Sequence, residues 1–87
     1  MHTLLAHAAR TGWEITPPRA LTVPGGEPLT FVGFILGGTQ IYTYWNTDNT
    51  LHDAQIYRGH EFEPFLTTSD QGVALGWLTA HGTEVAA

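Results

Sequence analysis

The chain has 87 residues, a formal net charge of −5 and no cysteine. A chain of this length is expected to form one domain over residues 1–87, with no disulfide and no thiolate metal site to supplement its core. With three arginines and no lysine, the chain is not expected to form a basic surface that binds nucleic acid. The lack of cysteine favours the cytoplasm over secretion. No apolar run is long enough to span a membrane.

A short helix is predicted at residues 3–10. Thr3 is of a type that caps helix N-termini, and Gly12 lies where glycine often ends a helix. A helix this short is not stable by itself in water and must dock on the rest of the chain. Its docking residues are expected to be Leu4, Leu5 and Trp13.

The segment from Trp13 to Pro28 is rich in proline, which disfavours helix and favours extended chain. Within it, Ala20 to Val23 is predicted to form a short edge strand. The PGGEP sequence that follows is predicted to turn the chain into the next strand.

Three strands come next, all rich in β-branched and aromatic residues. They are predicted at Leu29 to Leu36, Thr39 to Asn46 and Thr50 to Tyr57. Gly37-Gly38 and Asp48-Asn49 are predicted to form two-residue hairpin turns, because Gly, Asp and Asn tolerate the positive φ that such turns need. The three strands should therefore form an antiparallel meander.

The two turns determine which residues lie opposite one another. In this register Gly33 faces Tyr42 and Trp45 faces His52, and side chains alternate between the two faces of the sheet. One face is apolar and is predicted to form the core; it contains Val32, Phe34, Leu36, Ile41, Thr43, Trp45, Ala54 and Ile56. The second face is mixed; it contains Leu29, Phe31, Ile35, Tyr42, Tyr44, Asp53, Gln55 and Tyr57.

A second helix is predicted from Thr68 to His81, after an irregular segment at residues 58–66. Thr68 and Gln71 have the spacing of a capping box. The apolar stripe of this helix contains Val73, Trp77 and Leu78. The predicted fold is thus a small α+β domain: an antiparallel meander of three to four strands with an N-terminal and a C-terminal helix packed on one face.

Histidines beside carboxylates suggest a small-ligand or metal site, the alternative function for this chain. The residues concerned are His52, His60, Glu61 and Glu63. Zinc requires three or four converging ligands, and in the predicted register His52 and Asp53 point to opposite faces of the strand. No metal and no cofactor are therefore predicted. No nucleophile or phosphate-loop motif is present, so no catalytic residue is predicted and the chain is not expected to be an enzyme.

The mixed face is the leading candidate for function. Its proposed partner-binding residues are Phe31, Ile35, Tyr42, Tyr44, Asp53, Gln55 and Tyr57. Tyrosine is enriched at protein interfaces, since it combines a large area with few rotatable bonds. The competing interpretation is that residues 16–28, or Phe62 and Phe65, cover this face within the chain. The predicted strand at Leu29 to Leu36 has no charged residue, so its exposed edge would be prone to aggregation. We expect this edge to be covered, either by Ala20 to Val23 or by a second copy of the chain in a homodimer.

Two sequence segments resemble small accessory proteins of actinobacterial phages that have no assigned function. These segments are RTGWEI, after a short helix, and LTFVGFILGGTQIYTYWNTDNTLHDA. The resemblance carries no catalytic residue. It implies a regulatory or host-directed role, exerted through protein contact in the bacterial cytoplasm.

Overall fold

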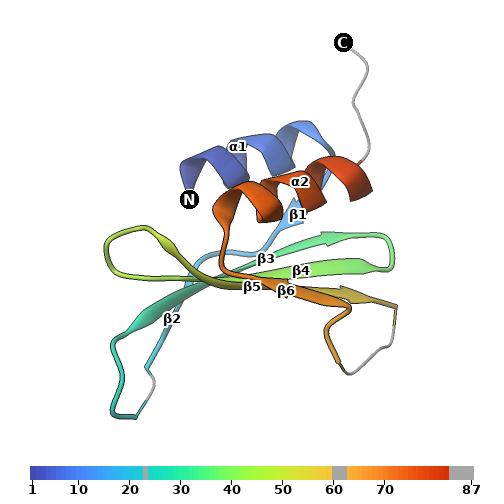
Figure 1. Cartoon of the computed structure of the whole chain (residues 1–87). Coiled ribbons are helices and arrows are strands. Elements are labelled where there is room, and N and C mark those ends of the chain that lie inside the picture. The colour runs from blue at the N-terminus through green and yellow to red at the C-terminus, as the bar shows by residue number, and fades with distance from the viewer. Residues whose placement is uncertain (23, 60–62, 83–87) are drawn as a thin grey trace.

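The computed structural model describes residues 1–22, 24–59 and 63–82, and it confirms the α+β class (Figure 1). Two helices and six strands are formed in these segments. In chain order they are α1 (His2–Arg10), β1 (Glu14–Ile15), β2 (Arg19–Leu21), β3 (Leu29–Leu36), β4 (Thr39–Trp45), β5 (Leu51–Arg58), β6 (Leu66–Thr68) and α2 (Gln71–His81).

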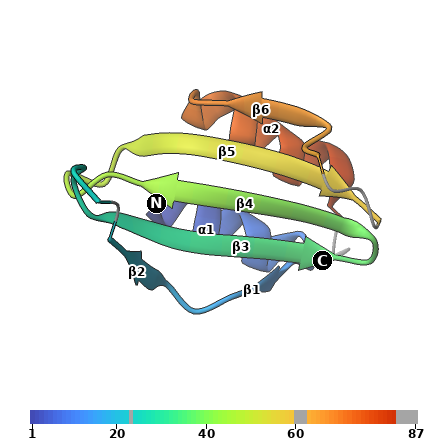
Figure 2. The same ribbon diagram turned by 90° about the horizontal axis from the view of Figure 1, so that it is seen from below.

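The strands form one antiparallel sheet in the order β1-β3-β4-β5-β6, and β2 also pairs with β3 (Figure 2). Both helices lie on one side of this sheet. The sheet is wider than the predicted meander, because β1 and β6 add a short strand at each edge. The edge of β3 is covered from within the chain: Arg19 pairs with Phe31 and Leu21 with Leu29. Val23, the end of the strand predicted there, lies outside the described residues.

The predicted core face is confirmed. The β3–β4 pairs are the expected ones, with Gly33 opposite Tyr42 and Phe34 opposite Ile41. Of the side chains predicted for this face all are fully buried except Leu36, which packs on the cluster from its margin. The helices supply most of the rest of the core, together with Trp13 after α1 and Leu51 on β5. The remaining members are Leu4, Ala8, Trp13, Leu51, Ala74, Trp77 and Leu78.

The β4–β5 hairpin differs from the prediction in its turn. Asn46 donates its backbone N–H to the Thr50 carbonyl (2.9 Å), so the loop has three residues, 47–49, and Asn49 has a φ of +70°. A three-residue loop shifts the register by one, and Trp45 therefore pairs with Leu51 rather than with His52. An irregularity between Tyr44 and Trp45 then restores the predicted pairs further along, such as Thr43 with Ala54. His52 is the extra residue of this β-bulge.

Helix α1 begins one residue earlier than predicted, and no side chain caps it, so the role expected for Thr3 is wrong. Gly12 has a φ of +85°, as expected at the helix end. Leu4 is fully buried, Leu5 packs against the core, and the Trp13 indole N–H donates to the Leu78 carbonyl at 3.1 Å. This bond ties the segment after α1 to α2.

Helix α2 is capped by Asp70, not by Thr68. The Asp70 Oδ1 atom accepts from the backbone N–H groups of Gly72 (2.7 Å) and Val73 (3.2 Å). Thr68 belongs instead to β6, where it pairs with Ala54. Val73 does not belong to the buried stripe, since its side chain is 44% exposed. None of the described helices has the length and apolar character needed to cross a membrane.

Candidate functional site

The side of the sheet turned away from the helices is called the aromatic face below. In Figure 2 this side is toward the viewer and both helices lie behind it. All seven residues proposed for partner binding lie on it and all are half-buried: Phe31, Ile35, Tyr42, Tyr44, Asp53, Gln55 and Tyr57. The strand register thus brings the whole predicted set together.

Four rings form a chain of contacts across three strands. The centroid of Phe31 lies 5.5 Å from that of Tyr42 and 5.4 Å from that of Tyr44, and Tyr42 lies 5.4 Å from Tyr57. The planes are tilted by 35–56°, and the centroid separations lie within the roughly 4.5–7 Å that aromatic pairs prefer. Each of the four rings therefore contacts at least one other ring of the cluster.

Glycine in β3 allows this packing. A Cβ atom on Gly33 would lie 3.3 Å from Tyr42 Cδ1 and 3.2 Å from Thr16 Oγ1. The Thr16 hydroxyl accepts the Gly33 N–H at 2.8 Å, and the Thr16 N–H donates to the Gly33 carbonyl at 2.9 Å. The Tyr42 ring can therefore lie over the bare backbone of Gly33, the residue with which it was predicted to pair.

Two tyrosine hydroxyls are oriented by amide side chains. Tyr42 donates to Gln40 Oε1 at 3.0 Å, and Tyr57 donates to Gln55 Oε1 at 3.0 Å. The Gln55 side-chain amide in turn donates from Nε2 to Asp53 Oδ2 at 3.4 Å. Within the described residues, the Tyr44 hydroxyl forms no hydrogen bond.

Burial raises the pKa of Tyr44 above its ordinary value of 10.0, and the negative charges that Tyr57, Asp53 and Tyr42 can carry raise it further. Asp53 is the cross-strand partner of Tyr44. The phenol therefore stays protonated at neutral pH and offers a hydrogen-bond donor beside a carboxylate.

The described segments that were proposed as covers border this face: the Thr16 side chain lies beside Gly33, and Gly26 and Glu27 lie at one end of the face. The proline-rich segment pairs along the edge of β3 through β1 and β2, and residues 16–19 line a second hollow together with Phe31. Phe65 is 44% exposed, and its ring contacts the guanidinium of Arg58, whose Cζ is 3.7 Å from the ring centroid. Phe62, the other predicted cover, lies outside the described residues.

The residues of the alternative site are only partly described. His60 and Glu61 lie outside the described residues, while His52 is on β5 and Glu63 is an exposed residue between β5 and β6. Within the described segments, no group of three His, Asp or Glu side chains could hold a metal ion. The bulge corrects the prediction that His52 and Asp53 point to opposite faces: both lie between the buried Leu51 and Ala54, on the side away from the helices.

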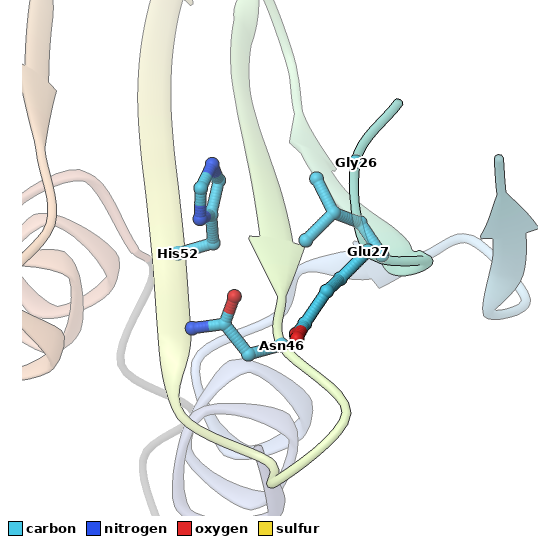
Figure 3. Close-up of a pocket in the computed structure, with 5 residues that line it drawn as sticks. Gly26, Glu27, Asn46 and His52 are labelled. Carbon is cyan, nitrogen blue, oxygen red and sulfur yellow. The ribbon is translucent and has the colours of Figure 1, made fainter. Parts of the chain in front are cut away.

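A hollow at one end of the aromatic face was not predicted. It has a volume of about 300 Å³ and is lined by Gly26, Glu27, Leu29, Asn46 and His52 (Figure 3). The bulge places His52 there, and the turn at Gly25, whose φ is +75°, brings Gly26 and Glu27 against the hairpin. The paired glycines marked that turn in the sequence, but no local pattern indicated what the turn would approach.

No protein family model, curated protein or solved structure matches this chain.

Proposed function

We propose that this protein is a non-enzymatic module that binds another protein through the aromatic face of its sheet. The observation that carries the proposal is the contrast between the two faces: helices seal one, while the other holds a half-buried aromatic cluster with no helix or strand over it in the described part of the chain. The same proposal includes a regulatory or host-directed role in the bacterial cytoplasm. It also includes that a phage or mobile element encodes the protein.

The chemistry of the aromatic face supports recognition by contact. Tyrosine and phenylalanine bury large areas on association, and Gln and Asp supply hydrogen-bonding groups around them. The rings of Tyr42 and Tyr57 are already held by neighbouring rings and by amide hydrogen bonds. Little side-chain freedom is then lost on binding, so the free-energy cost of ordering, roughly 0.5–1.5 kcal/mol for each side chain, is largely avoided.

Replacing Tyr42 and Tyr44 together by serine tests the proposal. The double variant is expected to keep its fold, because both side chains lie outside the helix-covered core, and to lose the partner. Binding is measured by affinity capture from an actinobacterial lysate with the wild-type chain and each variant as bait. Circular dichroism and thermal unfolding report on the fold.

The matched control replaces two exposed apolar residues on the helix side. Leu66 is 47% and Val73 44% exposed, so Leu66→Ser with Val73→Ser makes a comparable change away from the aromatic face. This control should capture the same protein as the wild-type chain.

Unfolding of the tyrosine variant would make the aromatic face part of the core and overturn the proposal. Undiminished capture by a folded tyrosine variant would overturn it as well. Light scattering distinguishes a second copy of the chain from a different partner.

A further inference from the structure

The hollow is continuous with the aromatic face. Leu29 precedes Phe31 by two residues on β3, Asn46 follows Tyr44 by two residues at the end of β4, and His52 adjoins Asp53. In Figure 3 the Asn46 amide extends toward the strand that carries His52, and the Glu27 side chain extends from the other side toward Asn46. A partner lying on the aromatic face would therefore reach the hollow without any change in the fold.

The polar groups around the hollow are mainly hydrogen-bond acceptors. The Asn46 Nδ2 atom donates to Thr50 Oγ1 at 3.0 Å, so that amide presents its carbonyl oxygen to the hollow. Glu27 contributes an exposed carboxylate, which is acceptor-only when ionised. The His52 imidazole adds a ring nitrogen that accepts a hydrogen bond in the neutral form. Such a set is complementary to a group that carries several N–H donors.

The carboxylates at the hollow and beside it are negative, while Arg19 is a cation that pairs with Phe31 further along the same face. Glu27 lines the hollow and Asp53 lies beside His52, and neither carboxylate has an ion pair with another described residue. The whole chain carries a net charge of −5, so the field of the molecule also favours a cation. An acidic ligand would be repelled here.

The size of the hollow fits one side chain. Its volume of about 300 Å³ is at the lower end of the range of roughly 300–1,000 Å³ that ligand pockets span. Leu29 provides an apolar wall. Arginine and lysine combine an apolar stem with a charged head, and they bury the stem against such a surface while the head stays at a polar rim.

We propose that this hollow is an anchoring subsite for one basic side chain, arginine or lysine, of the protein that binds the aromatic face. The inference rests on the proposed function and adds the chemical class of the partner: its contact surface is basic at the position that meets Glu27 and Asn46. The stem packs on Leu29, and the charged head donates to the Glu27 carboxylate and the Asn46 carbonyl.

Two amino acid derivatives whose backbone ends are blocked, and so uncharged, test the subsite directly. Nα-acetyl-arginine N-methylamide carries the cation, and the matching citrulline derivative has nearly the same shape without the charge. Binding is followed by NMR on the 15N-labelled chain, through the backbone amide of Gly26 and the side-chain amide of Asn46. The arginine probe should shift both signals, and the citrulline probe should bind about two- to fivefold more weakly or not at all, as expected for a solvent-exposed ion pair.

The variant Glu27→Gln should weaken binding of the arginine probe by about two- to fivefold, and added salt should reduce the difference. Glu14→Gln is the matched control, since Glu14 is an exposed carboxylate on β1, opposite Ile35 at the other end of the sheet. Equal binding of the two probes, or an arginine probe that leaves Gly26 and Asn46 unshifted, would overturn the subsite. If the tyrosine double variant then still abolishes partner capture, the proposed function stands without the basic anchor.

Discussion

Thr43 is a polar residue inside an otherwise apolar core. Its side chain is fully buried, its hydroxyl donates to the Val32 carbonyl at 2.7 Å, and the same oxygen accepts the Trp45 indole N–H at 2.8 Å. The hydroxyl therefore satisfies the polar atom of the largest fully buried side chain in the described segments, that of Trp45. A buried N–H left without an acceptor would cost about 1–3 kcal/mol.

The variant Thr43→Val should destabilise the chain by about 2–3 kcal/mol, because the shape is kept while the indole N–H loses its acceptor and the bond to Val32 is lost. Thr43→Ser keeps the hydroxyl and removes one methyl group, which should cost about 1 kcal/mol. Urea unfolding of the two variants measures the difference. A valine variant at least as stable as the serine variant would show that the hydroxyl is not needed.

At the same scale, the members of the aromatic face were predictable and their hydrogen bonds were not. Period-two alternation places Tyr42, Tyr44 and Tyr57 on one face as soon as the register is known. The bond from Tyr42 to Gln40 joins side chains two residues apart on one strand, and it depends on rotamers that alternation does not determine. The hollow depends on the approach of Glu27 to Asn46, two residues far apart in the sequence.

At the scale of elements, the β4–β5 hairpin shows why the faces were predicted correctly from a wrong turn. The three-residue loop displaces the register by one, which alone would exchange the two faces of β5. The bulge at His52 reverses that displacement, so Ala54 and Ile56 still enter the core. Asp48-Asn49 indicated a turn but not its length. His52 was consequently predicted to lie opposite Trp45, whereas the buried Leu51 takes that place and His52 is exposed.

The start of α2 is the second element that the sequence placed wrongly. Both Thr68 and Asp70 are acceptable cap residues, and the spacing of Thr68 to Gln71 favoured the earlier start. Pairing with β5 draws Leu66 to Thr68 into the sheet, which leaves Asp70 as the cap. Tertiary pairing here outweighs a local signal worth about 1 kcal/mol.

Removing the observed cap should weaken the fold accordingly. Asp70→Ala is expected to destabilise the chain by about 1 kcal/mol, because two N–H groups of the first turn lose their acceptor, whereas Asp70→Asn should keep most of the stability. Thermal unfolding followed by circular dichroism compares them. If alanine and asparagine behave alike, the Asp70 side chain does not act as the cap.

At the scale of the whole molecule, the chain forms a layer of two helices and a layer of sheet, and no helix covers the outer side of the sheet in the described residues. The helices bury the apolar face of the sheet, while the aromatic face has rings packed against one another and a hollow at its end (Figure 2). The fold class, the position of the helices and the central strand pairs follow from hydrophobic periodicity and turn residues. The short strands at both edges lack such a signal, since Glu14–Ile15 and Leu66–Thr68 are too brief for any period to be read.

The central claim is that the aromatic face is the surface that meets the partner. It is tested most directly by oxidative labelling of the free chain and of the captured complex, with the modification of each tyrosine measured by mass spectrometry. We expect Tyr42, Tyr44 and Tyr57 to be labelled in the free chain and protected together in the complex, while exposed Phe65 changes less. Tyrosines labelled as strongly in the complex as in the free chain would contradict the claim.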